Sequence, residues 1–516
     1  MAMNRREALK TIGGLAGAAT LGKFLPGCNG DSGGPEGIKN YVFLMLENRT
    51  YDHVFGARSW KEGKPGNGLT DTMRQPDSNN MPVAPYEPMN LAAQMCVSND
   101  PHHSWGSSRG QFNAGALDGF LTVHQADYPG ALEPMQYLTR KQQPISWALA
   151  DAYTSCDKWH CSLMGPTLPN RFYWHAGTSA GYRTNAVATN NDRALDVDTI
   201  YHRLQTKNVP WRYYYGNLPV ISVANSRLAP ARQFTNEYLM ESVKNFGDSE
   251  FAEGQFFKDA KEGKLAPVSY IDPAFYVNDD HPPTHPILAQ ALIASIYTAL
   301  ATSPQWKNCM LVITYDEHGG FYDHVAPPNL DASADDTAAR FPVDENGATT
   351  AGANEFTQLG FRVPAMVIGP YVKQGYISSV QYDHTSALKH LENTFGLDPL
   401  TARVTAATDL SDCIDMDRLA AGDWAEPIQM PEFQFEHDGT GEITSVAVAG
   451  ETWPYTKSIC APGVGGFSAD RSHCPMNDAA IKRPEIFKGF DLRSSEGLYL
   501  DSITRFLAEN QKKIGS

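Results

Sequence analysis

The sequence has few basic residues, and its body lacks a long hydrophobic run. Its 42 Lys and Arg residues stand against 58 Asp and Glu among 516, a formal net charge of −16. Duplex nucleic-acid binders need a basic face, and proteins held on anionic lipid need a polybasic surface, so both classes are excluded. No run of about 18 apolar residues follows the N-terminal segment, and we expect no transmembrane span in the mature protein.

Cysteine is also scarce. Of eight cysteines, none has the Cys-x-x-Cys spacing of a structural zinc site. One is Cys28, and the other seven are Cys96, Cys156, Cys161, Cys309, Cys413, Cys460 and Cys474. In an oxidising compartment these residues can form disulfides, and Cys460 with Cys474 is a candidate C-terminal pair. The spacing does not determine the remaining connectivity.

The first 35 residues have the pattern of an export signal. Arg5 and Arg6 precede a weakly apolar, Gly- and Ala-rich stretch over residues 11–21, as in twin-arginine signals. The glycines disfavour the alternative, an amphipathic helix. The segment LPGC, ending at Cys28, resembles a lipobox with a proline where a small residue is usual. We expect the twin-arginine export machinery as a partner and a periplasmic or secreted protein, with lipid attachment at Cys28 left open.

Short apolar runs and helical patterns alternate along the main part of the chain. The runs predict buried strands of a parallel sheet at Ile38–Leu46, Cys309–Tyr315 and Val363–Ile368. Helices are predicted at Ile145–Tyr153, Thr199–Gln205, Pro286–Leu300 and His384–Phe395. The alternation predicts an α/β fold, a three-layer α/β/α sandwich with a mainly parallel central sheet.

The chain divides into three predicted parts. After the signal and tether at 1–35, residues 36–400 form the main domain, in which the polar, aperiodic segment at about 326–358 is expected to be an insertion or lid. Residues 401–516 are expected to be an extension packed on this domain. The aromatic run 211–215 is typical of a strand with one face in the core, although it could also cage an ammonium group.

Two of the predicted strands end directly in acidic groups. Glu47-Asn48 follows the first strand, and Asp316-Glu317 follows the second. Ligands bind at the carboxyl ends of strands in such sheets, and crowded carboxylates repel unless a cation lies among them. One such pair alone would be a solvated or helix-capping group. Two pairs favour a divalent metal site, and oxygen ligands favour Ca²⁺, Mg²⁺ or Mn²⁺, whereas added imidazole would favour a transition metal.

Thr167 lies in a Gly-Pro-Thr turn before a short helical run. A hydroxyl at a helix N-terminus is well placed beside a bound anion, and contact with a metal would make it a nucleophile. Seen alone, the residue is equally typical of an N-cap. Arg171, further along the run, is suited either to a phosphate or to a structural carboxylate.

Histidines in tight turns are the remaining candidates. His103, His281 and His384 have acidic, Ser or Pro neighbours and are candidates for binding phosphate or protonating a leaving group. Asp280, beside His281, and His324, in the segment after Glu317, are further candidates for substrate contact.

Together these segments resemble the bacterial phospholipase C and acid phosphatase family of phosphoesterases, which includes plant non-specific phospholipases C. The resemblance covers roughly residues 38–396, with motifs at Glu47–Gly56, Asp100–Trp105, Leu117–Phe120, Gly165–Arg171, His281–Pro283, Thr314–His324 and Gly360–Pro364. Thr50-Tyr51 replaces the commoner Ser-Phe. The resemblance implies an alkaline-phosphatase-like fold with a metal-bound hydroxyl as nucleophile.

Carried onto this chain, the resemblance implies that the metal is surrounded by Glu47, Asn48, Thr167, Asp316 and Glu317. Thr167 would be the nucleophile, with the three histidines near the phosphate. The expected activity is phospholipase C cleavage of a phospholipid such as phosphatidylcholine. The alternatives are an acid phosphatase acting on soluble phosphomonoesters and a surface lipoprotein that binds a cation or phosphate without catalysis.

Overall fold

The fold is described from a computed structural model of the chain. It covers residues 37–88, 99–185, 197–216, 220, 255–275, 278–282, 285–331, 334, 356–440, 443–454 and 496–515. The predicted signal and tether, the pair Cys460 and Cys474, and most of the predicted lid lie outside these residues.

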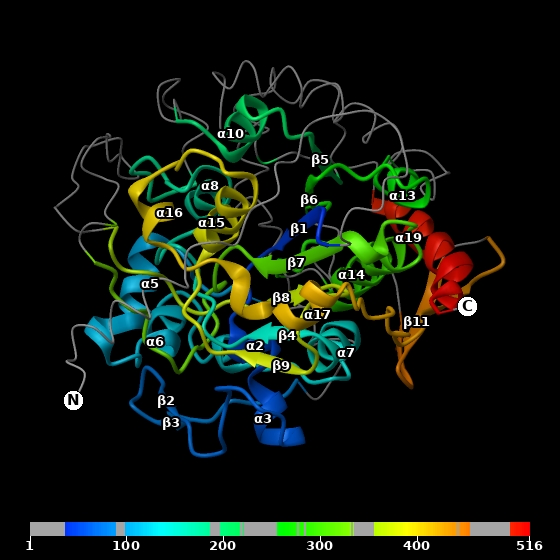
Figure 1. Ribbon diagram of the computed structural model, residues 1–516. Helices are drawn as coiled ribbons and strands as arrows, with labels where there is room; N and C mark the ends of the chain where they lie inside the picture. The colour runs from blue at the N-terminus through cyan, green and yellow to red at the C-terminus, as the bar shows by residue number, and fades with distance from the viewer. Residues whose placement is uncertain are drawn as a thin grey trace, which may run out of the picture. The chain divides into compact units, whose positions relative to one another are not determined.

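A seven-stranded sheet lies at the centre of the fold (Figure 1). In spatial order its strands are β5 (Trp211–Tyr215), β6 (Val268–Asp272), β1 (Asn40–Leu46), β7 (Cys309–Tyr315), β8 (Ala365–Ile368), β4 (Thr154–Cys156) and β9 (Tyr376–Ser378). The first four strands are parallel to one another, β8 is antiparallel to both of its neighbours, and β4 and β9 are parallel. The prediction of a mainly parallel sheet is confirmed, and the aromatic run 211–215 is a strand. The run 363–368 is the exception, because it was predicted as a parallel strand and its strand, β8, is antiparallel.

Strands β1 and β7 form the middle of this sheet. All seven residues of each strand are buried, which explains why their sequences are continuously apolar rather than alternating. Their register pairs Asn40 with Cys309 and Leu46 with Tyr315. Both strands therefore end at the same level, and the segments that follow them emerge side by side.

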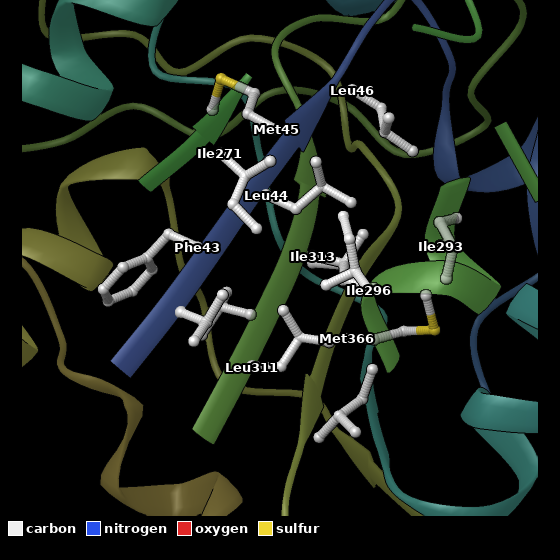
Figure 2. Close-up of a cluster of buried hydrophobic side chains, with 14 of the residues drawn as sticks. Phe43, Leu44, Met45, Leu46, Ile271, Ile293, Ile296, Leu311, Ile313 and Met366 are labelled. Carbon is white, nitrogen blue, oxygen red and sulfur yellow. The ribbon is translucent and has the colours of Figure 1, made fainter. Parts of the chain in front are cut away.

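Helices cover both faces of the sheet (Figure 1). One group is α8 (Thr167–Ala176), α10 (Ile200–Thr206) and α15 (His384–Phe395), and the other is α7 (Pro144–Ala152), α13 (Gln255–Lys261) and α14 (Pro286–Ala301). Trp174 of α8 packs edge-on against Phe43 of β1, with ring centroids 5.7 Å apart. Figure 2 shows Ile293 and Ile296 of α14 on the other side of the sheet from Phe43. The three-layer prediction is confirmed.

Further helices and strands complete the main domain and the C-terminal part. They include α2 (Tyr51–Val54), α3 (Gly56–Glu62), α5 (Trp105–Phe112), α6 (Phe120–Gln125), α16 (Ala402–Ala406), α17 (Met416–Ala421), β10 (Gln434–His437), β11 (Ile443–Val448), β12 (Glu451–Pro454) and α19 (Glu496–Asn510). Strands β10 to β12 form an antiparallel sheet, and α19 packs against α14. Within the described ranges, every helix is too short or too polar to cross a membrane.

Candidate active site

The segments after β1 and β7 meet at the carboxyl edge of the sheet, as predicted. The Arg49 main-chain N–H donates to the Glu317 carbonyl (3.1 Å). Asn48 has a φ of 60°, a left-handed conformation that asparagine adopts more readily than most residues, and its N–H donates to Asp316 Oδ1 (3.1 Å). The side chains of Glu47, Asn48, Asp316 and Glu317 are all fully buried.

A glycine permits this close approach. Gly319 has a φ of +61°, and a Cβ built on it would lie 2.1 Å from the Asn48 carbonyl oxygen. Its N–H donates to Glu317 Oε2 (2.8 Å), so the same residue also fixes the glutamate. Any side chain at this position would push the two acidic segments apart.

Glu317 is also held by residues to which sequence reasoning gave no role. His318 Nδ1 lies 3.0 Å from Glu317 Oε2, and its Nε2 lies 2.7 Å from Gln111 Oε1. Gln111 Nε2 donates to the His102 carbonyl (2.6 Å), which precedes His103. This chain of contacts joins the acidic segment to the loop that carries His103. Nothing in the sequence around Gln111 signals the link.

Thr167 is the first residue of α8, and its side chain is fully buried. The turn before it is fixed by Asn170, whose Nδ2 donates to the carbonyls of Gly165 (3.0 Å) and Pro166 (3.2 Å). Asn170 Oδ1 accepts the Leu163 N–H (3.1 Å). Sequence reasoning missed this role, although an asparagine just inside a predicted helix was the available signal.

Arg171 lies one turn after Thr167 on the same face of α8. Its Nη2 is 3.3 Å from Glu47 Oε1, its Nε donates to Asp316 Oδ2 (3.2 Å), and its Nη1 donates to Asp272 Oδ1 (3.3 Å). These contacts hold the start of α8 against the acidic segments. Of the two roles predicted for Arg171, they favour the structural one, because the fully buried guanidinium is engaged by three carboxylates.

Several oxygen atoms of this cluster have no hydrogen-bond partner among the described residues although they are buried. They are Glu47 Oε1 and Oε2, Asn48 Oδ1, Thr167 Oγ1 and Glu317 Oε1. Such atoms are rare in proteins because each one costs free energy. An oxygen donor set of this kind fits a hard divalent cation such as Ca²⁺, Mg²⁺ or Mn²⁺.

The pKa shifts of the cluster also favour a site for a cation. Burial and the charge of Asp316 raise the pKa of Glu47 well above its usual range. Burial also raises the pKa of Asp316, although Arg171 opposes the shift. Arg171 faces Glu47, Asp272 and Asp316, and one positive charge does not balance three carboxylates. A bound cation would relieve that repulsion.

Two of the predicted histidines lie against the Asn48 amide. Asn48 Nδ2 is 3.3 Å from Nε2 of His103 and 3.0 Å from Nε2 of His281. Burial lowers the pKa of His103, but the charges of Glu317 and Asp100 outweigh it and raise the pKa to about 9. Asp100, His103 and His281 each have one donor atom within 4.8 Å of the others. This mixed nitrogen and oxygen group adjoins the all-oxygen group.

His384 lies beside the acidic segments. It is the first residue of α15, as predicted, and is fully buried. Its Nε2 donates to the Asp316 carbonyl (2.7 Å), and its Nδ1 accepts the Trp159 indole N–H (3.4 Å). Burial lowers its pKa to about 4. Both ring nitrogens are therefore engaged within the chain, and the predicted role in binding phosphate or protonating a leaving group stays a prediction.

The two other predicted substrate contacts have partners within the chain. Asp280 is buried, accepts a hydrogen bond from the Tyr315 hydroxyl (2.7 Å) and lies 3.4 Å from Arg49 Nη2. His324 Nδ1 lies 2.6 Å from Asp52 Oδ2. The assignment of both residues to substrate binding stays a prediction.

Comparison with known families identifies the family of the chain. The model of the Phosphoesterase family matches residues 38–398. The chain belongs to the phosphoesterase family. This phosphoesterase is therefore a phosphoric ester hydrolase, as predicted, and the matched range contains every residue of the site described above.

The relatives of this phosphoesterase include bacterial and plant proteins. It is 30% identical over 430 residues to "Phospholipase C A" of Mycobacterium tuberculosis, which covers 77% of this chain and 82% of that protein. It is 30% identical over 404 residues to "Non-specific phospholipase C6" of Arabidopsis thaliana, covering 73% and 72%. A solved structure in the alkaline phosphatase superfamily from Vibrio parahaemolyticus matches 92% of this chain and 89% of its own, with 11% identity and a TM-score of 0.35.

The substitution Arg171→Met is expected to lower the free energy of unfolding by about 3–5 kcal/mol, because it leaves buried carboxylates without their cation. Urea unfolding of the full chain in excess chelator measures this without a contribution from bound metal. Lys264→Met is the control, since this exposed lysine pairs with Glu262 at the surface. Equal stability of the two variants would contradict the structural role of Arg171.

Proposed function

We propose that this phosphoesterase is a metal-dependent phospholipase C. It would cleave a phospholipid such as phosphatidylcholine to diacylglycerol and the phosphorylated headgroup. The observation that carries the proposal is the set of buried oxygens without a hydrogen bond where β1, β7 and α8 meet. The names of the bacterial and plant relatives support the choice of substrate class.

The residues of the site divide into a metal-binding group and a reacting group. Glu47, Asn48, Asp316 and Glu317 would hold the cation together with Thr167. When bound, a divalent cation lowers the pKa of a nearby hydroxyl and neutralises charge on phosphoryl oxygens. The remaining chemistry belongs to the side chains of the chain itself.

Thr167 Oγ1 is the proposed nucleophile. It attacks phosphorus in line with the departing alkoxide, at the positive end of the α8 dipole. His103 and His281 lie beside the Asn48 amide nitrogen, where they can bind phosphoryl oxygens, and one of them protonates the diacylglycerol alkoxide. Water then releases the phosphorylated headgroup from Thr167.

Thr167→Ala is expected to lower kcat by about 1,000-fold or more, because the attacking hydroxyl is lost. Thr167→Ser should keep measurable turnover, since it retains a hydroxyl at the same position. Headgroup release is the measurement, and Thr206→Ala, at the exposed end of α10, is the control that should leave turnover unchanged. Near-normal turnover of Thr167→Ala would show that the nucleophile is another residue.

Removal of the metal is expected to abolish activity, and added Ca²⁺, Mg²⁺ or Mn²⁺ should restore it. Glu47→Gln should raise the ion concentration needed for half-maximal reactivation by about tenfold or more, because it removes one ligand charge. Glu62→Gln, in a surface pair with Arg140, is the matched control. Full turnover by protein shown to be metal-free would contradict the proposal.

A second candidate function shares this machinery. A non-specific acid phosphatase would use the same nucleophile and cation on soluble phosphomonoesters. We expect kcat/KM for phosphatidylcholine in mixed micelles to exceed that for a soluble aryl phosphate by about tenfold or more. A preference for the aryl phosphate would favour the phosphatase, and no product from either substrate would favour a non-catalytic binding protein.

We propose further that the protein acts outside the cytoplasm. The twin-arginine pattern of residues 1–35 supports export, and the segment ending at Cys28 leaves a lipid anchor open. The net charge of −16 disfavours approach to anionic bilayers at long range. A zwitterionic headgroup such as phosphocholine is therefore the substrate that best suits this surface.

A further inference from the structure

Two cysteines from distant parts of the chain are in contact. Cys156 is the last residue of β4, and Cys413 is the last residue of the short helix η7 (Leu410–Cys413). Both residues are fully buried free cysteines, and Thr154 Oγ1 of β4 donates to the Cys413 carbonyl (3.5 Å), which brings the two segments together. The candidate active site uses neither of them.

Hydrogen bonds fix the two segments beside each other. The Lys373 N–H donates to the Cys413 carbonyl (2.9 Å). Cys156 is in register with Ser378 of β9, and Ser378 Oγ donates to Asp412 Oδ2 (2.6 Å). Asp412 directly precedes Cys413, so the pairing of β4 with β9 places the main chains of the two cysteines beside each other. The proximity of the two residues is therefore part of the fold.

A tyrosine completes the surroundings of the two thiols. The Tyr382 hydroxyl lies 3.7 Å from Cys413 Sγ and 3.2 Å from Ser378 Oγ, and the residue is buried. The interaction with Cys413 and burial raise the pKa of Cys156 well above its usual range. Both sulfurs are buried, so the folded chain shields them from solvent oxidants.

The other cysteines in the described ranges are arranged differently. The Cys161 thiol donates to the Leu163 carbonyl (3.3 Å), and the Cys309 thiol donates to the Gln305 carbonyl (3.2 Å). Both thiols are thus bonded to main-chain oxygen atoms. They provide controls that are equally buried.

We propose that Cys156 and Cys413 form a disulfide when the chain folds under oxidising conditions. One thiolate attacks a small disulfide such as oxidised glutathione and releases one glutathione thiol. The second thiolate then attacks the mixed disulfide and releases the other glutathione thiol. The two cysteines lose two electrons, the glutathione disulfide gains them, and the two protons end on the released thiols. Because the folded chain buries both sulfurs, the exchange takes place during folding.

This bond would tie the sheet to the C-terminal part of the chain. It closes a long loop, and closing a long loop restricts the unfolded chain most strongly. It also fixes the segment around Tyr382, which leads directly to His384 and its hydrogen bond to the Asp316 carbonyl. The inference is independent of the reaction proposed above, because neither sulfur contacts the reacting groups.

The test begins with the full chain, reduced and unfolded. One sample refolds in a mixture of reduced and oxidised glutathione, and a second refolds in a reducing agent. Peptide mapping without reduction is expected to find a cross-linked Cys156–Cys413 peptide in the first sample only. That sample should also have a higher Tm than the second. If both cysteines of the glutathione-refolded chain react with an alkylating agent after unfolding, the proposal is wrong.

Other cysteines can contribute to the difference in Tm, so matched variants separate their effects. Cys156→Ser and Cys413→Ser are expected to reduce the redox-dependent difference in Tm by the same amount, whereas Cys309→Ser should leave it unchanged. If Cys156→Ser and Cys413→Ser both keep the full redox-dependent difference in Tm, the proposal is wrong. If the serine variants do not fold, the peptide map of the unaltered chain still decides the question.

Discussion

The ion pairs of one buried arginine hold the candidate active site together. Arg171 contacts carboxylates at the ends of three adjacent strands, β6, β1 and β7, and is itself part of α8. It therefore fixes the N-terminus of α8, and Thr167 with it, at the carboxyl edge of the sheet. The same contacts offset only part of the local negative charge. The arrangement that positions the Thr167 hydroxyl would therefore also favour a bound cation.

The parts of the fold that the sequence predicts are those with strong local signals. Residues 38–46 and 309–315 were recognisable because strands buried on both faces are continuously apolar, and the abrupt change to Glu47-Asn48 and to Asp316-Glu317 marked the strand ends. Strands β4 and β9, of three residues each, have no such run. Their pairing depends on contacts between residues far apart in the sequence, which periodicity does not reveal.

The residues of the site likewise divide into those with a local sequence signal and those without one. The cluster of oxygen-bearing side chains could be predicted from residue type and position, because both are visible in the sequence. The contacts of Arg171 and His384 could not, since a guanidinium or an imidazole suits a substrate and a structural partner equally well. Only the fold shows that Arg171 faces three carboxylates and that both nitrogens of His384 form hydrogen bonds within the chain. Asn170 had a weak local signal, whereas Gln111 acts through contacts that no local pattern marks.

The position of the Asn48 amide has a thermodynamic consequence. Its oxygen belongs to the unpaired set that suits a cation, while its nitrogen lies against two histidines proposed to bind phosphate. A cation bound to the amide oxygen would fix the plane of the amide and with it the position of the amide nitrogen beside the histidines. Binding at the two sides would then be coupled, and such coupling is reciprocal: the cation would tighten the binding of a phosphate analogue by the factor by which that analogue tightens the binding of the cation.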